Sequence, residues 1–526
     1  MEIMERNSRP RAVFMAFGTI GDVSPLAAIA AVLANDQKHY QVVFISHAEH
    51  QNINLYLKAK NVAYISVSTP PALSFVQFSD ASDDPNFISF GMYKVKIQTE
   101  HKQECLSAVA KVLGDVPCIK GDFIVINFFA LEGWNIAELY QVQCVVAAPY
   151  VVPYSAPSSF ERCFKKELPL LYKYFLQASD NEICWNDIVH WMWPLFTEEW
   201  GKWRSECLCL GSLPFMDPVT NLPKWHMRER SPLLLYGFSM EIVECPGYWP
   251  ANAHVCGFWC LPMEWQFCCS GCREMLSPTY SNCSIKKNML CANHAIFENF
   301  LMDESSSCLP IFIGLSSIGR LGFIRNPEAF LSVLEAIIKN TKYRFILFTA
   351  GYEPLEAVIH LISGASSDSD KLSNLNFRKD CTLLFGDRLL CFSGSISYTW
   401  MFQRCAVVVH HGGSGSTAAA LHAGVPQIIC PFILDQFYWA ERLSWLGVAP
   451  NALERHHLVP DTNDPSSINA AADKLAKAII LALSPTMKEQ ALKLSEILSA
   501  EDGVGAALQI LKEQVLILAG DGTDMP

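Results

Sequence analysis

Short apolar runs alternate with segments of helical periodicity along most of the chain. Residues 11–18, RAVFMAFG, form the first such run and end in glycine, which is typical of a buried strand. Apolar residues then recur at helical spacing behind Ser24-Pro25, which predicts a helix capped by Ser24 with proline at its first position. Three further apolar runs, at 40–47, 122–130 and 143–151, are predicted strands. This alternation indicates a parallel sheet covered on both faces.

A segment rich in Cys, Ser and Asn, residues 261–296, interrupts this pattern and is predicted to be a linker with an insertion. The alternation then resumes with a predicted helix at 326–340 and predicted strands at 309–317, 343–351, 381–387, 405–411 and 426–432. We therefore expect an N-terminal domain over 1–260 and a second α/β domain over 297–526. Two such halves joined by a linker imply a cleft between them.

Length and composition agree with two domains and exclude some classes of function. The chain has 526 residues, is 51% hydrophobic and carries a formal net charge of -12. It contains no block of Lys and Arg that would bind nucleic acid. Its start, MEIMERNSRPRAVFMAFG, does not match a secretory signal, and no run of about 18 apolar residues suggests a membrane-spanning helix. The twenty cysteines are therefore expected to be thiols in the cytoplasm.

A tryptophan-rich segment, residues 185–204, reads WNDIVHWMWPLFTEEWGKWR. It suits either an apolar pocket or peripheral contact with a membrane surface. The simpler interpretation is an amphipathic helix pair packed on a core.

The stretch VVVHHGGSGSTAAALHAGVP, residues 407–426, places a glycine-rich turn between a buried strand and a helix that ends at Gly424. Glycines let the backbone approach a ligand closely, and Ser414 or Ser416 can cap the helix. The free amides and positive dipole end of such a helix suit a phosphate. The turn matches neither a P-loop nor a dinucleotide fingerprint. The expected phosphate ligands are His410, Gly412, Gly413, Ser414, Gly415 and Ser416.

Two carboxylates stand at the ends of predicted strands. Asp435 precedes Gln436 after the strand IICPF, where the pair can hydrogen-bond adjacent sugar hydroxyls; otherwise, Asp435 caps the following helix. Asp22 lies in the loop FGTIGDVSP, and since Ser24 is the better cap, Asp22 is a candidate general base for an acceptor hydroxyl.

These motifs resemble those of a known enzyme family. HHGGSGSTAAALHAGVP and PFILDQFYWAERL resemble the donor-site segment of sterol 3-beta-glucosyltransferases and related UDP-sugar transferases. FGTIGDVSPLAAIAAVL, PIFIGLSSIG and INFFALEGWNIAE are similar to three further segments of that family, in the same order. The segment SISYTW, residues 395–400, departs from the family's Pro-His-Asp-Trp and keeps only Trp400, and no N-terminal lipid-binding domain of the fungal kind is recognised.

The resemblance implies a GT-B fold, in which two Rossmann-like domains with parallel sheets face each other across a cleft. It implies inverting transfer of glucose from UDP-glucose to a sterol-like, lipophilic hydroxyl, without a metal or other cofactor. A phenolic or triterpenoid acceptor, or a catalytically silent UDP-sugar or lipid-binding homologue, are the alternatives. By the same resemblance, Asp22 is the base, Ser317 faces phosphate, and Asp435 and Gln436 bind the sugar. Ser397 and Trp400 are assigned to the uracil and ribose region, and Glu132, Trp191 and Trp193 to the acceptor region.

The cysteines of the insertion suggest a zinc site, but the pattern argues against one. Cys268-Cys269-x2-Cys272 stands without a second C-x2-C pair, so we expect no metal at this segment. The candidate ligands are Cys268, Cys269, Cys272, Cys283, Cys291 and His294.

Overall fold

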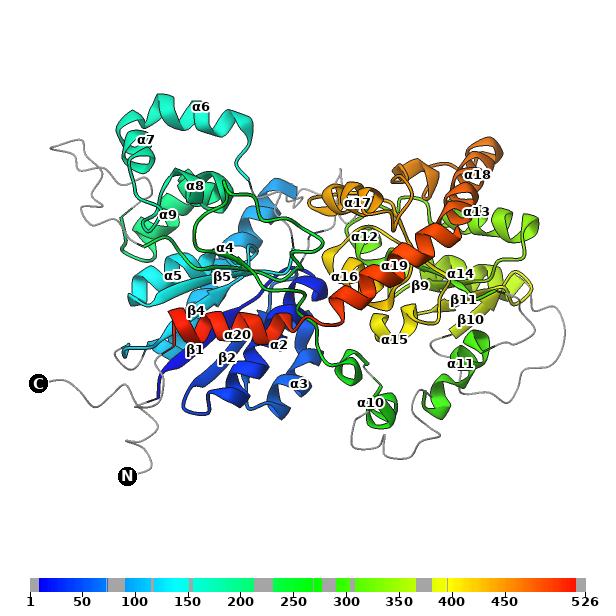
Figure 1. Cartoon of the computed structure of the whole chain (residues 1–526), viewed down its shortest axis with the longest axis horizontal. Helices are drawn as coiled ribbons and strands as arrows, with labels where there is room; N and C mark the ends of the chain where they lie inside the picture. The colour runs from blue at the N-terminus through cyan, green and yellow to red at the C-terminus, as the bar shows by residue number, and fades with distance from the viewer. Residues whose placement is uncertain are drawn as a thin grey trace, which may run out of the picture. The chain divides into compact units, whose positions relative to one another are not determined.

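The chain forms two compact α/β units (Figure 1). The computed structural model describes residues 9–71, 73, 90–114, 118–150, 155–211, 230–267, 269–276, 290–302, 308–365, 381–394 and 396–516. Of these residues, unit 1 contains 9–71, 90–260 and 502–516, and unit 2 contains 73 and 261–501. The Cys-rich segment thus belongs to unit 2.

Unit 1 is built on a seven-stranded parallel sheet in the order β3-β2-β1-β4-β5-β6-β7. The strands are β1 (Arg11–Met15), β2 (Gln41–His47), β3 (Ala63–Val67), β4 (Phe123–Ile126), β5 (Gln143–Ala148), β6 (Leu234–Tyr236) and β7 (Ala253–Val255). The predicted parallel sheet is confirmed, and β3, β6 and β7 were not predicted. All five residues of β1 are buried, as a strand covered on both faces requires.

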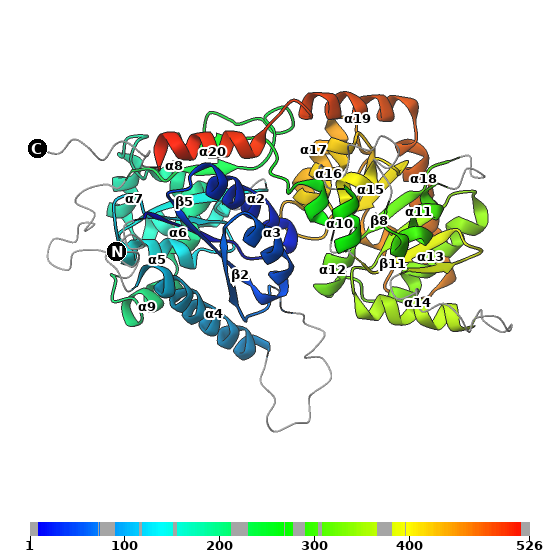
Figure 2. The same cartoon turned by 90° about the horizontal axis from the view of Figure 1, so that it is seen from below.

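Helices cover both faces of this sheet, with α2 and α20 over one face and α4 and α5 over the other (Figure 2). The helices of unit 1 are α2 (Ile20–Asp36), α3 (Asn54–Ala59), α4 (Phe90–Leu113), α5 (Glu132–Tyr140), α6 (Ser158–Glu167), α7 (Pro169–Leu176), α8 (Trp185–Asp187), α9 (Glu198–Glu206) and α20 (Gly503–Gln514).

The α20 helix is held in unit 1 by a close backbone contact and an ion pair. A Cβ built on Gly503 would lie 2.5 Å from the carbonyl carbon of Gly257, so only glycine fits there. The Trp259 Nε1 donates to the Gly503 carbonyl over 3.1 Å. Near the other end of α20, Lys512 Nζ lies 2.6 Å from the Asp36 carboxylate on α2.

Unit 2 is built on a six-stranded sheet in the order β10-β11-β9-β8-β12-β13. The strands are β8 (Ile311–Gly314), β9 (Phe345–Phe348), β10 (Cys381–Leu384), β11 (Leu389–Phe392), β12 (Val407–His410) and β13 (Gln427–Ile429). Five strands are parallel as expected, whereas β10 pairs antiparallel with β11 at one edge. The tight connection at 385–388 permits only an antiparallel pair, because a parallel neighbour needs a long crossover.

Two apolar cores flank this sheet, because alternate strand residues point to opposite faces. Ile311 and Ile313 belong to one core, with α13, α14 and α18, and Phe312 belongs to the other, with α11, α15 and α16. The helices of unit 2 are α10 (Ser270–Leu276), α11 (Ala295–Leu301), α12 (Ser316–Arg320), α13 (Pro327–Asn340), α14 (Glu353–Ala365), α15 (Tyr398–Phe402), α16 (Ser414–Ala423), α17 (Gln436–Trp445), α18 (Pro465–Ala482) and α19 (Pro485–Leu498).

Each sheet has a point where the strand order reverses, and ligands of open α/β sheets bind beside the carboxyl ends of strands at such points. In unit 1 this point lies between β1 and β4, whose following loops lead to Asp22 and Glu132. In unit 2 it lies between β8 and β12, whose following loops lead to Ser317 and to the glycine-rich turn. The topology therefore places the candidate residues of each unit at the edge where a ligand is expected.

The tryptophan-rich segment is part of the packed core of unit 1. Trp191 is fully buried, and Trp185 and Trp203 are nearly so. The Lys102 ammonium lies 4.6 Å from the centre of the Trp200 ring. These side chains stabilise the fold rather than form an exposed apolar surface, which agrees with the simpler interpretation of this segment. Among the helices described, none combines the length and apolar character needed to cross a bilayer.

Candidate functional site

The glycine-rich turn joins the end of β12 to the first turn of α16. Gly412 has φ +88°, a conformation that favours glycine, and Gly413 is the N-cap of α16. No side chain caps this helix, so the prediction that Ser414 or Ser416 is the cap is wrong. The first amides of a helix have no partner within it, and here no capping oxygen competes for them. The helix ends at Gly424 in the left-handed conformation, as predicted.

His410 does not face this turn as a ligand. The side chain is buried, its Nδ1 accepts from the Gly412 amide over 3.0 Å, and its Nε2 lies 2.8 Å from Gln427 Oε1. Since Nδ1 accepts, Nε2 carries the proton and donates to Gln427. Burial lowers the pKa of His410 to about 4, so the ring is neutral near pH 7. Both ring nitrogens are thus engaged within the protein, and the expected direct hydrogen bond to phosphate is not available; His410 instead holds the backbone of the turn.

His411, which sequence reasoning passed over, is the histidine beside the helix N-terminus. A Cβ built on Gly413 would lie 2.5 Å from His411 Nε2, so the ring lies directly against the N-cap residue. Its side chain is partly exposed, unlike that of His410. Burial and the neighbouring His410 lower the pKa of His411 to about 3. Successive residues of a strand point to opposite sides, which is the signal that separates the two histidines.

The pair Asp435-Gln436 lies against the same turn. A Cβ built on Gly412 would lie 3.0 Å from the Gln436 carbonyl oxygen, so the two backbones touch there. Gln436 Oε1 accepts from the amides of Phe432 and Ile433 at 2.9 and 3.1 Å, which directs its Nε2 donor away from them. Asp435 Oδ2 accepts from Trp439 Nε1 over 3.1 Å. Asp435 is the N-cap residue of α17, yet makes no side-chain cap hydrogen bond.

Ser317 lies in the first turn of α12, three residues after β8. Because β8 pairs with β12, with Gly314 opposite His410, both loops leave the same edge of the sheet.

Ser397 and Trp400 are placed in the interior of unit 2. The Ser397 hydroxyl donates to Gln266 Oε1 over 2.9 Å and accepts from the Trp400 amide, which caps α15. Trp400 is 1% exposed and packs between Phe267 and the Arg404 guanidinium. Core packing and capping already engage both side chains, and their assignment to the uracil and ribose region stays a prediction. Ser395 of the same segment lies outside the described residues.

Asp22 belongs to the first turn of α2, which begins at Ile20 with Thr19 as the N-cap. Its Oδ2 accepts from the Thr19 amide and hydroxyl at 2.7 and 2.8 Å. The expected cap at Ser24 is wrong, and Pro25 lies inside the helix. Asp22 thus has a structural role. Nevertheless, burial raises its pKa to about 6, against the lowering effect of the Thr19 hydrogen bonds. Such a carboxylate is ionised near pH 7 and is more basic than an ordinary aspartate.

Asn127 and a histidine cluster hold the Asp22 loop. Asn127 is fully buried; its Nδ2 donates to the Phe17 carbonyl over 2.8 Å, and its Oδ1 accepts from the Phe17 amide over 3.3 Å. His50 Nε2 lies 2.8 Å from the Gly18 carbonyl, and the rings of His47 and His101 pack against Phe17. Sequence reasoning missed these residues because they lie in or just after β2, just after β4 and in α4, far apart along the chain.

The three residues assigned to the acceptor region lie in unit 1 but in different surroundings. Glu132 is partly exposed at the start of α5, beside the point where the strand order reverses. Trp193 is partly exposed, with its ring 6.0 Å from that of Phe160. Trp191 is fully buried against Trp134 and cannot line an open pocket, so its assignment is corrected.

The known proteins that this chain resembles in sequence include several glycosyltransferases. A family model described as "Erythromycin biosynthesis protein CIII-like, C-terminal domain" matches residues 392–501. A sterol 3-beta-glucosyltransferase of Arabidopsis thaliana is 23% identical over 507 residues, 94% of this chain and 64% of that protein. The UDP-sugar-dependent glycosyltransferase 52 of Dictyostelium discoideum is 26% identical over 332 residues, 61% of this chain. The matched part is only 16% of the Dictyostelium protein, so the chain spans less than two thirds of these relatives.

Solved structures share the fold at low sequence identity. The glycotransferase of kitacinnamycin has a TM-score of 0.54 and 13% identity, with 97% of this chain and all of that chain covered. The calicheamicin glycosyltransferase has a TM-score of 0.51 and 14% identity, with 96% and 98% covered. The two sheet-based α/β units and the likeness to these solved structures thus define the GT-B fold. Over most of its length, the chain is similar to sterol 3-beta-glucosyltransferases.

Proposed function

We propose that the protein transfers glucose from UDP-glucose to the hydroxyl of a sterol or a similar lipophilic acceptor. The observation that carries this proposal is the uncapped first turn of α16, with Gly412 at positive φ before it and His411 against its N-cap. The names of the relatives support the donor and the acceptor: sterol 3-beta-glucosyltransferases match 94% of this chain at 23% identity.

Unit 2 holds the donor in this proposal. The amides of residues 414–416 and the positive end of the α16 dipole bind the diphosphate, and His411 donates to one of its oxygens. Ser317, on the loop from the neighbouring strand, adds a hydroxyl. The fixed orientation of the Gln436 amide presents its Nε2 to a sugar hydroxyl, while Asp435 accepts from another. The contact of Gly412 with Gln436 keeps the diphosphate and sugar subsites adjacent.

Unit 1 supplies the acceptor side and the base. The acceptor oxygen attacks the anomeric carbon as the bond from that carbon to the β-phosphate oxygen breaks. Asp22 takes the hydroxyl proton, and UDP leaves with the bonding pair and the negative charge. The new glycosidic bond has inverted configuration. The helix amides and His411 are in place before the charge develops, which is how fixed dipoles stabilise a transition state.

A bound divalent cation has no assigned step in this reaction. The positive end of the α16 dipole stabilises the charge of the leaving diphosphate, and the neutral His411 ring adds a hydrogen-bond donor. Brief exposure to EDTA during the assay is therefore expected to leave the initial rate unchanged. A rate that falls at once and returns with magnesium would contradict this part of the proposal.

The test is an incubation of the purified chain with UDP-glucose and separate sterol, triterpenoid and phenolic acceptors. Mass spectrometry is expected to detect a sterol that has gained one hexose, and proton NMR a β-linkage. A product with phenolics or triterpenoids alone would refute the sterol acceptor. Binding of UDP without any product would indicate a silent homologue, and absence of UDP binding would refute the donor site.

A variant pair connects the activity with the site. His411→Ala is expected to weaken UDP binding, measured by calorimetry, because the ring lies against the N-cap residue of α16. His360→Ala is the matched control, since His360 is an exposed residue on α14. Equal affinities for the two variants would remove His411 from the site.

A further inference from the structure

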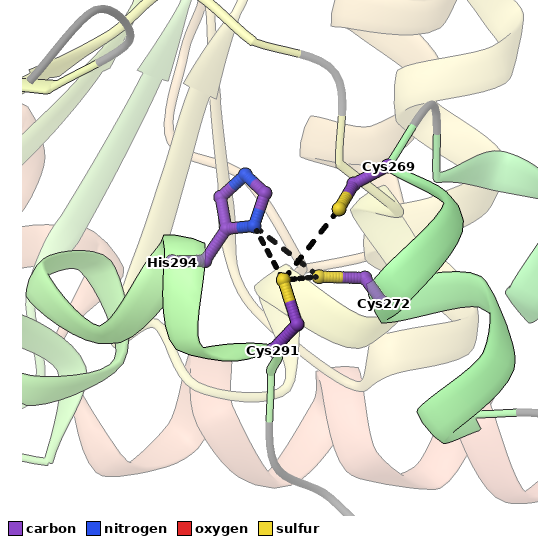
Figure 3. A group of neighbouring side chains, drawn as sticks. All are labelled: Cys269, Cys272, Cys291 and His294. Carbon is purple, nitrogen blue, oxygen red and sulfur yellow. Dashed lines mark hydrogen bonds between the residues drawn. The ribbon is translucent and has the colours of Figure 1, made fainter. Parts of the chain in front are cut away.

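The Cys-rich segment of unit 2 brings four metal-ligating side chains together (Figure 3). Cys269 and Cys272 lie at the start of α10, and Cys291 and His294 lie at the short helical turn before α11. Their ligand atoms all lie within 4.8 Å of one another. The chain thus contains a C-x2-C pair and, after 18 intervening residues, a C-x2-H pair. No second C-x2-C pair is present, as expected, but the C-x2-H pair supplies the remaining two ligands, so the expectation of no metal at this segment does not follow.

The separations within the cluster match those of a tetrahedral site. Cys291 Sγ lies 3.5 Å from Cys269 Sγ and 3.4 Å from Cys272 Sγ. His294 Nδ1 lies 3.3 Å from Cys272 Sγ and 3.4 Å from Cys291 Sγ. With zinc–sulfur bonds of about 2.3 Å and zinc–nitrogen bonds of about 2.0 Å, ideal tetrahedral angles place two sulfurs about 3.8 Å apart and sulfur and nitrogen about 3.5 Å apart. Each observed separation is within a few tenths of an ångström of these values.

Neither a disulfide nor ordinary core packing accounts for this arrangement. A disulfide requires two sulfurs about 2.05 Å apart, and the cysteines of the cluster are free thiols. Backbone amides of Cys272 and Gly271 also donate to the Cys269 sulfur. Three sulfur atoms and one imidazole nitrogen within 4.8 Å of one another are the donor set of a metal ion.

We propose that Cys269, Cys272, Cys291 and His294 bind one Zn²⁺ ion in a closed structural site. The donor set of three thiolates and one imidazole leaves no coordination position for a substrate, which separates this site from catalysis. Zinc suits soft sulfur and imidazole donors in tetrahedral geometry.

The four ligands lie next to Gln266 and Phe267, which contact α15. Phe267 packs on Trp400, and Gln266 accepts from the Ser397 hydroxyl at the N-cap of α15. Cys272 belongs to the same apolar core as Trp400, and the His294 ring contacts Phe392 at the end of β11. Binding of zinc therefore joins α10 and α11 to the end of β11 and to α15. Loss of the ion is expected to loosen this side of unit 2.

The experiment measures metal in the full chain, purified under reducing conditions without a metal-affinity tag. Elemental analysis is expected to find about one zinc per chain. Cobalt added to the metal-free chain is expected to give the intense visible bands of a tetrahedral thiolate complex. Cys272→Ser and Cys291→Ser are expected to reduce the zinc content to background. Cys308→Ser, which replaces an exposed thiol of unit 2 outside the cluster, is expected to retain the full content.

Each other outcome overturns the proposal. Iron with acid-labile sulfide in place of zinc would indicate a cluster, and fewer than 20 titratable thiols in the denatured, metal-free chain would indicate a disulfide. Failure of the unaltered chain to bind zinc or cobalt would also refute the site. Because the unaltered chain is titrated directly, variants that do not fold leave the test intact. No substrate enters these measurements, so their result does not depend on the proposed transferase activity.

Discussion

Replacement of Asp22 by asparagine is expected to abolish turnover and stabilise the fold at the same time. The side chain has an ordinary pKa of 3.8 in the unfolded chain and a pKa of about 6 in unit 1, chiefly because of burial. Ionisation therefore favours the unfolded chain. The stability associated with the protonated form is fully present below pH 3.8 and is lost as the pH rises through 6. Asparagine cannot ionise and keeps an oxygen that accepts from Thr19.

The magnitude follows from the two pKa values. The interval from 3.8 to about 6, at about 1.4 kcal/mol per pH unit, corresponds to about 3 kcal/mol near pH 8. Solvent reaches part of the side chain, so we expect Asp22→Asn to gain about 1–2 kcal/mol at pH 8. Near pH 4.5 the gain is expected to be about 0.5 kcal/mol, because most of the native carboxyl is already protonated.

The assay is urea unfolding at pH 4.5 and pH 8, followed by intrinsic fluorescence, together with turnover at pH 8. Asp36→Asn is the matched control on the same helix. The Lys512 hydrogen bond lowers the pKa of Asp36, so its replacement is expected to destabilise the fold at pH 8. If Asp22→Asn shows no pH-dependent gain, burial does not dominate this carboxyl. If it retains turnover, Asp22 is not the base, since loss of a general base lowers the rate by about 100-fold or more.

The remaining predictions concern the two histidines, the turn and the pH profile. His410→Ala is expected to lower the free energy of unfolding by about 2–4 kcal/mol in urea titrations, because it removes two buried hydrogen bonds. His411→Ala should change stability little; the reverse ranking would contradict their assigned positions. Gly412→Ala is expected to cost about 1–3 kcal/mol and weaken UDP binding, given φ +88° and a Cβ 2.9 Å from Ile429. Gly364→Ala, a helical position with open space, is its control in the same thermal and binding assays. Finally, kcat/KM should fall below pH about 6 as Asp22 becomes protonated, and a profile flat down to pH 4.5 would refute that assignment.

Much of the donor site could be predicted from the sequence because its signals are local. The apolar run 407–409, the glycines after it and Gly424 define the strand, the turn and the helix end within about twenty residues. The two histidines point to opposite sides of the chain at the end of β12. His410 points to the buried side because it hydrogen-bonds Gln427 on the neighbouring strand β13, and His411 then points towards the helix N-terminus. The assignment to His410 failed for this reason.

Local signals also misplaced the start of α2. Ser24-Pro25 is a good helix start in isolation, yet Thr19 and Asp22 form the cap one turn earlier. Similarly, the Asn127 bonds that hold the Asp22 loop join residues 110 positions apart, and no pattern within a single segment reveals them. Trp400 and Trp191 were assigned by motif and composition to the regions that bind uracil or ribose and the acceptor, and tertiary packing places both side chains in cores.

The path of the chain has a practical consequence for dissecting this protein. Unit 1 is completed by residues 502–516, which follow unit 2 in the sequence. A fragment that stops at Cys260 would expose the apolar surface of α2 that α20 covers and leave Asp36 without Lys512. Recombinant production of unit 1 alone therefore calls for a fusion in which a short peptide bridges residue 260 to residue 502. The main stretch of unit 2, residues 261–501, is continuous and can be cloned directly.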